Sequence, residues 1–144
     1  RYSSPKNSPP DRSHTMPAPS SATYSAAALV AAHTSFKDLI DAGTAGSIKI
    51  RDSSDVLLAQ IPLSDPCGSV NGTTGQLTFS IAGPDSSADA SGTAAYGEFC
   101  ASDGTVHLSL PAQAGSVAVS GKLVLNTLSI IAGGPVGIVT ATIG

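Results

Sequence analysis

The feature that most constrains the fold is a two-residue alternation of apolar and polar side chains, which recurs in short runs after Gly46. Ile48 and Ile50 alternate with polar residues, the turn-forming residues 52–55 follow, and the alternation resumes through Leu63. A period of two is that of a half-buried β-strand, and two such runs joined by an Asp/Ser turn indicate a β-hairpin. Residues 96–110 repeat this pattern around residues 102–104. The sequence therefore predicts a mainly β domain.

Turn residues divide the rest of the chain at short intervals. Further strands are predicted at residues 77–81, 116–119, 123–126, 129–131 and 136–143, with a long loop at residues 83–91. About eight short strands with frequent turns are typical of a β-sandwich or a jelly-roll-like barrel. In the second hairpin, the alternation predicts that Val106 and Leu108 face the core and that His107 faces outward.

The core of such a domain has to be aliphatic. Hydrophobic residues make up 41% of the chain but aromatic residues only 4%, so Val, Ile, Leu and Ala must supply the buried surface. A small domain of this kind buries little area for each residue, and association into an oligomer or a larger assembly would add burial.

One segment has a different period. The apolar residues between residues 26 and 40, together with His33, recur at spacings of three and four, which is typical of an amphipathic helix. Ser25 is a suitable N-cap and Gly43 a suitable stop, so we expect a helix over residues 25–42 that covers one end of the β-structure. His33 and Phe36 are interpreted as packing residues, and Leu39 and Ile40 belong to the same apolar periodicity.

The N-terminus is unlike the rest. Residues 1–22 contain five prolines among mostly serine and charged residues, a composition that predicts an extended arm ahead of a single β-rich domain at residues 23–144. Residues 1–15 carry a net charge of +2, whereas residues 16–144 carry −5. A basic arm on an acidic body suits contact with an acidic partner surface. The candidate partner-binding residues in the arm are Arg1, Tyr2, Lys6 and Arg12.

Residue types used in catalysis are present but are not arranged for it. His14, His33 and His107 lie far apart, and none stands at metal-ligand spacing from a cysteine. The chain has no Gly-x-Ser-x-Gly motif. Residues 115–122 match a phosphate loop poorly, because the glycines are one residue too far apart and Leu123 stands where Ser or Thr would bind magnesium. We therefore expect no catalytic residues, no cofactor and no metal site.

The carboxylates have a structural interpretation. Glu98 is the only glutamate and is expected on the surface of a strand. The aspartates expected to cap their own turns are Asp52, Asp55, Asp65, Asp85 and Asp103. The acidic body offers no basic patch for nucleic acid, and no apolar run approaches the roughly 20 residues that span a membrane.

Cys67 and Cys100 are the only cysteines. One pair without metal-like spacing is compatible with a disulfide or with two buried thiols. We favour buried thiols, because an aliphatic core short of large side chains accommodates cysteine as a small apolar residue.

An ordered set of short segments begins with the helix end at residues 35–43, Ser-Phe-Lys-Asp-Leu-Ile-Asp-Ala-Gly, and the strand at residues 46–52, Gly-Ser-Ile-Lys-Ile-Arg-Asp. Residues 58–66, 88–94, 102–105, 125–127 and 132–136 complete the set. Over about residues 24–143, this ordered set resembles a family of small tailed-bacteriophage virion proteins. Residues 1–15 lie outside this pattern, and Cys67 and Cys100 stand where small or aliphatic residues are expected.

The resemblance implies a non-enzymatic virion protein, with no catalytic residues to transfer. The leading hypothesis is a capsid decoration (cement) protein that bridges neighbouring capsid subunits. Its expected partners are the major capsid protein or other virion proteins, and its expected oligomer is a homotrimer. The alternative is a tail-associated or secreted β-sandwich that binds a glycan or receptor, although only Tyr2, Tyr24 and Tyr96 could supply an aromatic platform. A hydrolase is the third hypothesis.

Overall fold

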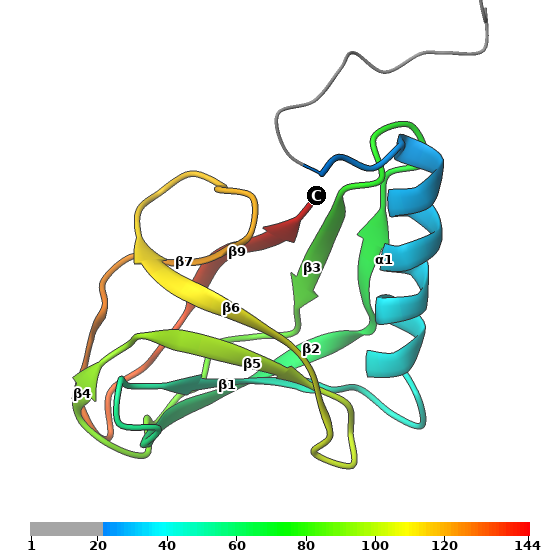
Figure 1. Ribbon diagram of the computed structural model, residues 1–144. Coiled ribbons are helices and arrows are strands. Elements are labelled where there is room, and N and C mark those ends of the chain that lie inside the picture. Colours follow the sequence, from blue (N-terminus) through cyan, green and yellow to red (C-terminus); the bar gives the residue numbers. More distant parts are fainter. Residues whose placement is uncertain (1–21) are drawn as a thin grey trace, which may run out of the picture.

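The computed structural model describes residues 22–144 and shows one helix and nine strands in that part of the chain (Figure 1). The predicted arm, including Arg1, Tyr2, Lys6 and Arg12, lies outside the described residues but for residue 22. In chain order the elements are α1 (Ala26–Ile40), β1 (Ser47–Arg51), β2 (Leu57–Val70), β3 (Leu77–Ile81), β4 (Gly92–Thr93), β5 (Tyr96–Cys100), β6 (Val106–Ala114), β7 (Lys122–Leu125), β8 (Ser129–Ile130) and β9 (Ile138–Ile143).

Seven strands close into a barrel in the order β1-β2-β3-β9-β7-β6-β5, while β4 and β8 form a separate two-stranded sheet. All neighbours in the barrel are antiparallel except β6 and β7, which pair in parallel. The prediction of a mainly β fold with one N-terminal helix is confirmed. The strands meet in a closed ring, and closure removes the unpaired edges that an open sheet would expose.

Both predicted hairpins are present. β1 pairs with β2 across residues 52–56, and β5 pairs with β6 across residues 101–105. β2 is longer than expected, because its first half pairs with β1 and its second half continues along β3. β2 therefore pairs with β1 in its first half and with β3 in its second half. This long strand carries the chain from the first hairpin to the opposite side of the barrel.

The core is aliphatic, as the composition predicts. Ile48, Ile50 and Ile61 are fully buried at the centre, and Phe99 is the largest side chain among the fully buried residues. Phe79 from β3 meets Phe99 from β5 with ring centroids 4.4 Å apart. Aromatic pairs at such a distance add to the stabilisation from burial alone. The core therefore links the two sides of the barrel through its one described aromatic pair.

The helix is confirmed, with ends close to those predicted. The Ser25 hydroxyl accepts the amide of Ala28 at 3.1 Å, and Gly43 takes a φ of +89° just beyond the last turn. His33 and Ile40 are buried, and Phe36 packs against the core. Leu39, which belongs to the predicted apolar periodicity, does not pack inward, since its side chain is 49% exposed. The inward stripe follows the 3,4 spacing of residues 33, 36 and 40, and Leu39 lies to one side of it.

The helix contacts β2 and β6, which are separated by β1 and β5 in the barrel order. It therefore lies across the end of the barrel (Figure 1), in agreement with the expected covering role. The His33 ring accounts for part of this contact, because its Nδ1 atom lies at hydrogen-bonding distance from the carbonyl of Gly75, between β2 and β3.

The predicted strand at residues 116–119 is wrong. These residues form a loop in which Val117 is 70% exposed. The reason is the parallel pairing of β6 and β7, since the chain must travel back from the end of one strand to the start of the other. The wide loop drawn between β6 and β7 in Figure 1 is this connection.

The prediction that Val106 faces the core is also wrong, since it is 42% exposed. Phe99 lies opposite Leu108, but Cys100 lies opposite Val106, so the ladder shifts by one residue at this point. Such a bulge breaks the inward-outward alternation. Leu108 and His107 are both half-buried, Leu108 packs against the core, and the buried residue of β6 is Leu110.

The turn aspartates behave as predicted at three positions. Asp52 accepts the amides of Ser54 and Val56, Asp85 accepts that of Ser87, and Asp103 accepts that of Thr105. Asp65 does not cap a turn, because it lies within the long strand β2. The Asp55 side chain instead accepts a hydrogen bond from a tyrosine on β5.

Candidate functional site

The outer face of the barrel around β1 gathers several of its polar side chains. Because Ile48 and Ile50 point into the core, Ser47, Lys49 and Arg51 point outward. β1 lies between β2 and β5, and Lys49 stands directly opposite Gln60 on one side and Glu98 on the other. This outer surface of β5, β1 and β2 is called the β1 face below.

One end of the β1 face is a closed polar network. Arg51 Nε forms an ion pair with Glu98, and its Nη1 donates to the Asp55 carbonyl at 3.0 Å. The Tyr96 hydroxyl donates to the Asp55 carboxylate at 2.6 Å. These contacts tie the turn of the first hairpin to β5. Each charged group has a partner, so the network stabilises the fold and leaves little free for a ligand.

The network changes the acidity of its members. The hydrogen bond to Asp55 raises the pKa of Tyr96 to about 12, because the neutral phenol is the donor. The hydrogen bond to Glu98 raises the pKa of Arg51, which is charged at any physiological pH in either case. With a pKa of about 12, the Tyr96 phenol stays protonated near neutral pH, so it acts as a hydrogen-bond donor within the network.

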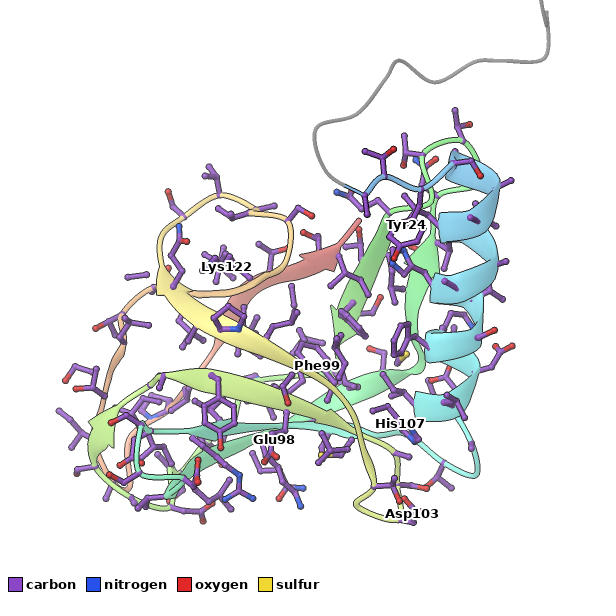
Figure 2. All side chains as sticks on the ribbon, in the orientation of Figure 1. Tyr24, Glu98, Phe99, Asp103, His107 and Lys122 are labelled. Carbon is purple, nitrogen blue, oxygen red and sulfur yellow. The ribbon has the colours of Figure 1, made fainter. Side chains whose placement is uncertain are left out.

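The other end of the β1 face is a hollow of about 580 Å³. Its walls come from the segment before and within β1, from β2, and from the turn of the second hairpin. The lining residues are Ala45, Gly46, Ser47, Lys49, Gln60, Pro62, Ala101, Ser102, Asp103 and Gly104. Glu98 and Asp103, which mark the β5 side of this region, lie along the lower part of the molecule in Figure 2. This space is called the Lys49 hollow below.

Gly46 is needed for the shape of the Lys49 hollow. A Cβ atom at this position would lie 2.2 Å from the backbone oxygen of Cys100. The close approach of the two chain segments therefore requires glycine. Ser102 fixes the other wall, because its hydroxyl lies 3.2 Å from the Ala42 carbonyl and 3.4 Å from the Thr44 amide.

A second, smaller hollow of about 280 Å³ lies beside β8. It is more apolar, with Ile130, Ile131, Pro135 and Val136 among its lining residues. Ile131 is 70% exposed, which is unusual for a side chain of this size. The hollow is a second concave surface of the protein, beside the two-stranded sheet of β4 and β8.

The cysteines are buried and are not bonded to each other. The Cys67 amide donates to Asp41 at 2.8 Å, while Asp41 also receives the ammonium of Lys37 at 3.3 Å. Burial raises the pKa of the Cys67 thiol to about 12 and also raises that of Cys100. Because the thiolate is the reactive form, neither cysteine is prepared to act as a nucleophile.

The histidines are separated in the fold as they are in the sequence. His33 is on the helix and His107 on β6, and no group of three or more metal-binding side chains occurs within residues 22–144. His14 lies in the part of the chain that is not described. No helix in residues 22–144 is long and apolar enough to cross a membrane.

Sequence reasoning assigned partner binding to four residues of the arm and missed the Lys49 hollow. A usable signal was present, since the alternation places Ser47, Lys49 and Arg51 on one face. The sequence does not reveal that Glu98 lies on the strand beside β1, or that it pairs with Arg51 and not with Lys49.

Comparisons with protein-family models, with curated proteins and with solved structures found no match to this chain.

Proposed function

We propose that this protein is a non-enzymatic structural component of a tailed-bacteriophage virion, acting as a capsid decoration protein that bridges and stabilises neighbouring capsid subunits. The observation that carries the proposal is the position of the family-like segments. Residues 46–52, 58–66 and 102–105 all contribute to the Lys49 hollow. Residues 125–127 and 132–136 contribute to the hollow beside β8. Five of the seven segments that carry the resemblance thus contribute to two concave surfaces, whereas the helix end at residues 35–43 and residues 88–94 do not.

The architecture supports a contact role. The seven strands of the closed barrel expose no edge for uncontrolled pairing, so contacts on the barrel surface are selected by side chains. The polar network on the β1 face keeps that surface rigid through cross-strand contacts between Arg51, Glu98, Tyr96 and Asp55. A rigid surface loses little conformational entropy when a partner binds.

The charge distribution supports a bridging role. Within residues 22–144, nine acidic and four basic residues give the body a net charge of −5, whereas residues 1–15 carry +2. Two segments of opposite charge can contact two different neighbours. Linking two contacts raises the apparent affinity above that of either alone. Arg1, Lys6 and Arg12 would supply the charge of the arm and Tyr2 an aromatic contact.

The test begins with purified particles of the virus whose genome encodes the chain. Mass spectrometry should find the protein in the particle in many copies. Particles that lack it should release their genome at a lower temperature, and earlier than complete particles when the salt concentration is lowered. Small contributions from each copy add up over a symmetric shell. Depleted particles that are equally stable but fail to adsorb to cells would replace this proposal with the receptor-binding alternative.

The arm can be tested separately. Removing residues 1–22 should leave the thermal unfolding of the isolated barrel unchanged and should reduce its retention on particles. Retention equal to that of the full chain would contradict a bridging role for Arg1, Tyr2, Lys6 and Arg12. Light scattering of the isolated protein measures its molar mass, which should be three times that of one chain if the proposed trimer forms.

A further inference from the structure

Lys49 is a cation without an ion-pair partner within residues 22–144, because the carboxylate across from it already pairs with another residue. Glu98 stands directly opposite Lys49 on β5, but its carboxylate pairs with Arg51, one position further along the same face. On the other side Lys49 faces Gln60, which is neutral. Within residues 22–144 no carboxylate lies within ion-pair distance of the Lys49 ammonium.

The Lys49 hollow also contains neutral donors that are not fully used. The Gln60 amide nitrogen donates one hydrogen to the Ser47 hydroxyl at 3.2 Å and has a second hydrogen available. Because Ser47 accepts in that contact, its own hydroxyl hydrogen remains available. One ammonium and two neutral donors therefore line the same space.

From this arrangement we infer that the Lys49 hollow is a carboxylate-binding site that receives an aspartate or glutamate side chain of a partner protein. A carboxylate has one negative charge and two acceptor oxygens, which match one cation and two neutral donors. A phosphate is a poorer match, because its second charge would face a single cation with the Asp103 carboxylate on the same rim.

A protein side chain is a better occupant than a free small carboxylate. The hollow is open on one side, since it lies on the outer face of a barrel, and a small ligand there would keep much of its surface in water. A side chain carried by a protein brings further contacts from its own chain at the rim of the hollow, where the lining residues Pro62 and Ser102 are exposed. The identity of the partner rests on the proposed virion function, whereas the chemistry of the site does not.

The test is an NMR titration of the isolated full chain labelled with nitrogen-15. Two small probes are added in separate titrations, the N-acetyl amide derivatives of aspartate and of asparagine, whose backbone groups carry no charge. At low salt, the aspartate probe should shift the amide signals of Ser47, Lys49 and Gln60, and the asparagine probe should shift them much less. Lys49→Gln should remove this preference and lower the affinity for the aspartate probe about two- to tenfold, as expected for the loss of an exposed charge-assisted contact. Lys122→Gln, on β7, is the matched control and should behave like the wild type.

Equal shifts with both probes, shifts that map away from the hollow, or an unchanged preference in Lys49→Gln would overturn the assignment. A Lys49→Gln spectrum that matches the wild type outside the hollow excludes unfolding as the cause of any loss. Failure of this experiment removes the carboxylate site and leaves the particle-stability test of the proposed function unaffected.

Discussion

The two hairpins of the barrel share one sequence pattern but use it differently. Both join an apolar-alternating strand to a second one through a turn with aspartate, and both contain a shift in register beside the turn. In the first hairpin, the Asp55 amide donates to the Asp52 carbonyl, and Arg51 and Asp55 contact each other and side chains of β5. In the second, the turn forms the wall of the Lys49 hollow. Similar local sequences therefore produce a closed, internally paired surface at one end of the β1 face and an open one at the other.

The difference between the two ends of the β1 face shows that an exposed charged residue can be assigned to stability or to binding only when its ion-pair partners are known. Arg51 and Lys49 are two residues apart on the same strand and on the same face. Arg51 is paired with Glu98, which leaves Lys49 with no carboxylate partner among residues 22–144. The position of a single glutamate separates a residue that stabilises the fold from one that is available for contact.

The largest expected effect is a difference in unfolding free energy between a buried and an exposed substitution in the second hairpin. Phe99→Ala removes the largest fully buried side chain and its contact with Phe79, and should lower the free energy of unfolding by roughly 3–5 kcal/mol. Val106→Ala, on the partner strand, should change it by about 0.5 kcal/mol or less, because that side chain is 42% exposed. Denaturant titration measures both. Similar losses in the two variants would mean that Val106 faces the core after all.

A smaller effect is expected when the first turn loses its cap. Asp52→Ala removes an oxygen that accepts two backbone amides at 2.8 and 2.9 Å, and should cost about 1–3 kcal/mol of unfolding free energy. Asp52→Asn keeps an acceptor oxygen and should recover most of this loss. Asp103→Ala, in the second turn, removes one exposed amide contact and should cost less. An equal or larger loss for Asp103→Ala would show that the second turn is as tightly fixed as the first.

The closed network should also be visible in the titration of Tyr96. In a background where Tyr2 and Tyr24 are replaced by Phe, the ultraviolet absorbance of the phenolate should report a pKa of about 12. Asp55→Gly removes the acceptor and suits the left-handed backbone at this position, where φ is 65°, so it should return the pKa toward the ordinary value of 10.0.

The sign of the linked effect on stability follows from the raised pKa. The folded state holds the proton more tightly than the unfolded state, so the contribution of this hydrogen bond is complete below the ordinary pKa and is lost as the pH rises from there toward 12. Identical titration curves with and without Asp55 would show that the network is not formed in solution.

The parts of the fold that could be predicted from sequence are those set by neighbouring residues. The helix with Ser25 as its cap and the two hairpins each depend on patterns within a few residues. Closure of the barrel through β3, β9 and β7 depends on pairings between distant segments, such as Leu77 with Ile143, and local alternation carries no information about them. Residues 116–119 have the composition of a strand, yet the parallel pairing of β6 and β7 requires a loop there.

The candidate site was harder to predict for the same reason. The Lys49 hollow is made by three segments that are far apart in the sequence, and the availability of Lys49 depends on cross-strand register. Val106 shows the limit within a single strand, because one bulge beside Cys100 reverses the expected alternation.

The smallest expected effect concerns acid and the second turn. Hydrogen bonds from Thr105 lower the pKa of Asp103 below its ordinary value of 3.8. The folded state therefore prefers the charged carboxylate, and the stability that this preference adds is complete above the ordinary value and is lost as the pH falls through the folded one. Asp103→Asn keeps the acceptor oxygen but cannot titrate, so the difference in unfolding free energy between wild type and variant should be constant near neutral pH. It should shrink below about pH 4, where the wild-type carboxylate takes up its proton. Denaturant titrations at a series of pH values measure this difference. A difference that grows on acidification would mean that the charged form of Asp103 is disfavoured by the fold, and that the open turn beside the Lys49 hollow has a different charge balance from the one described.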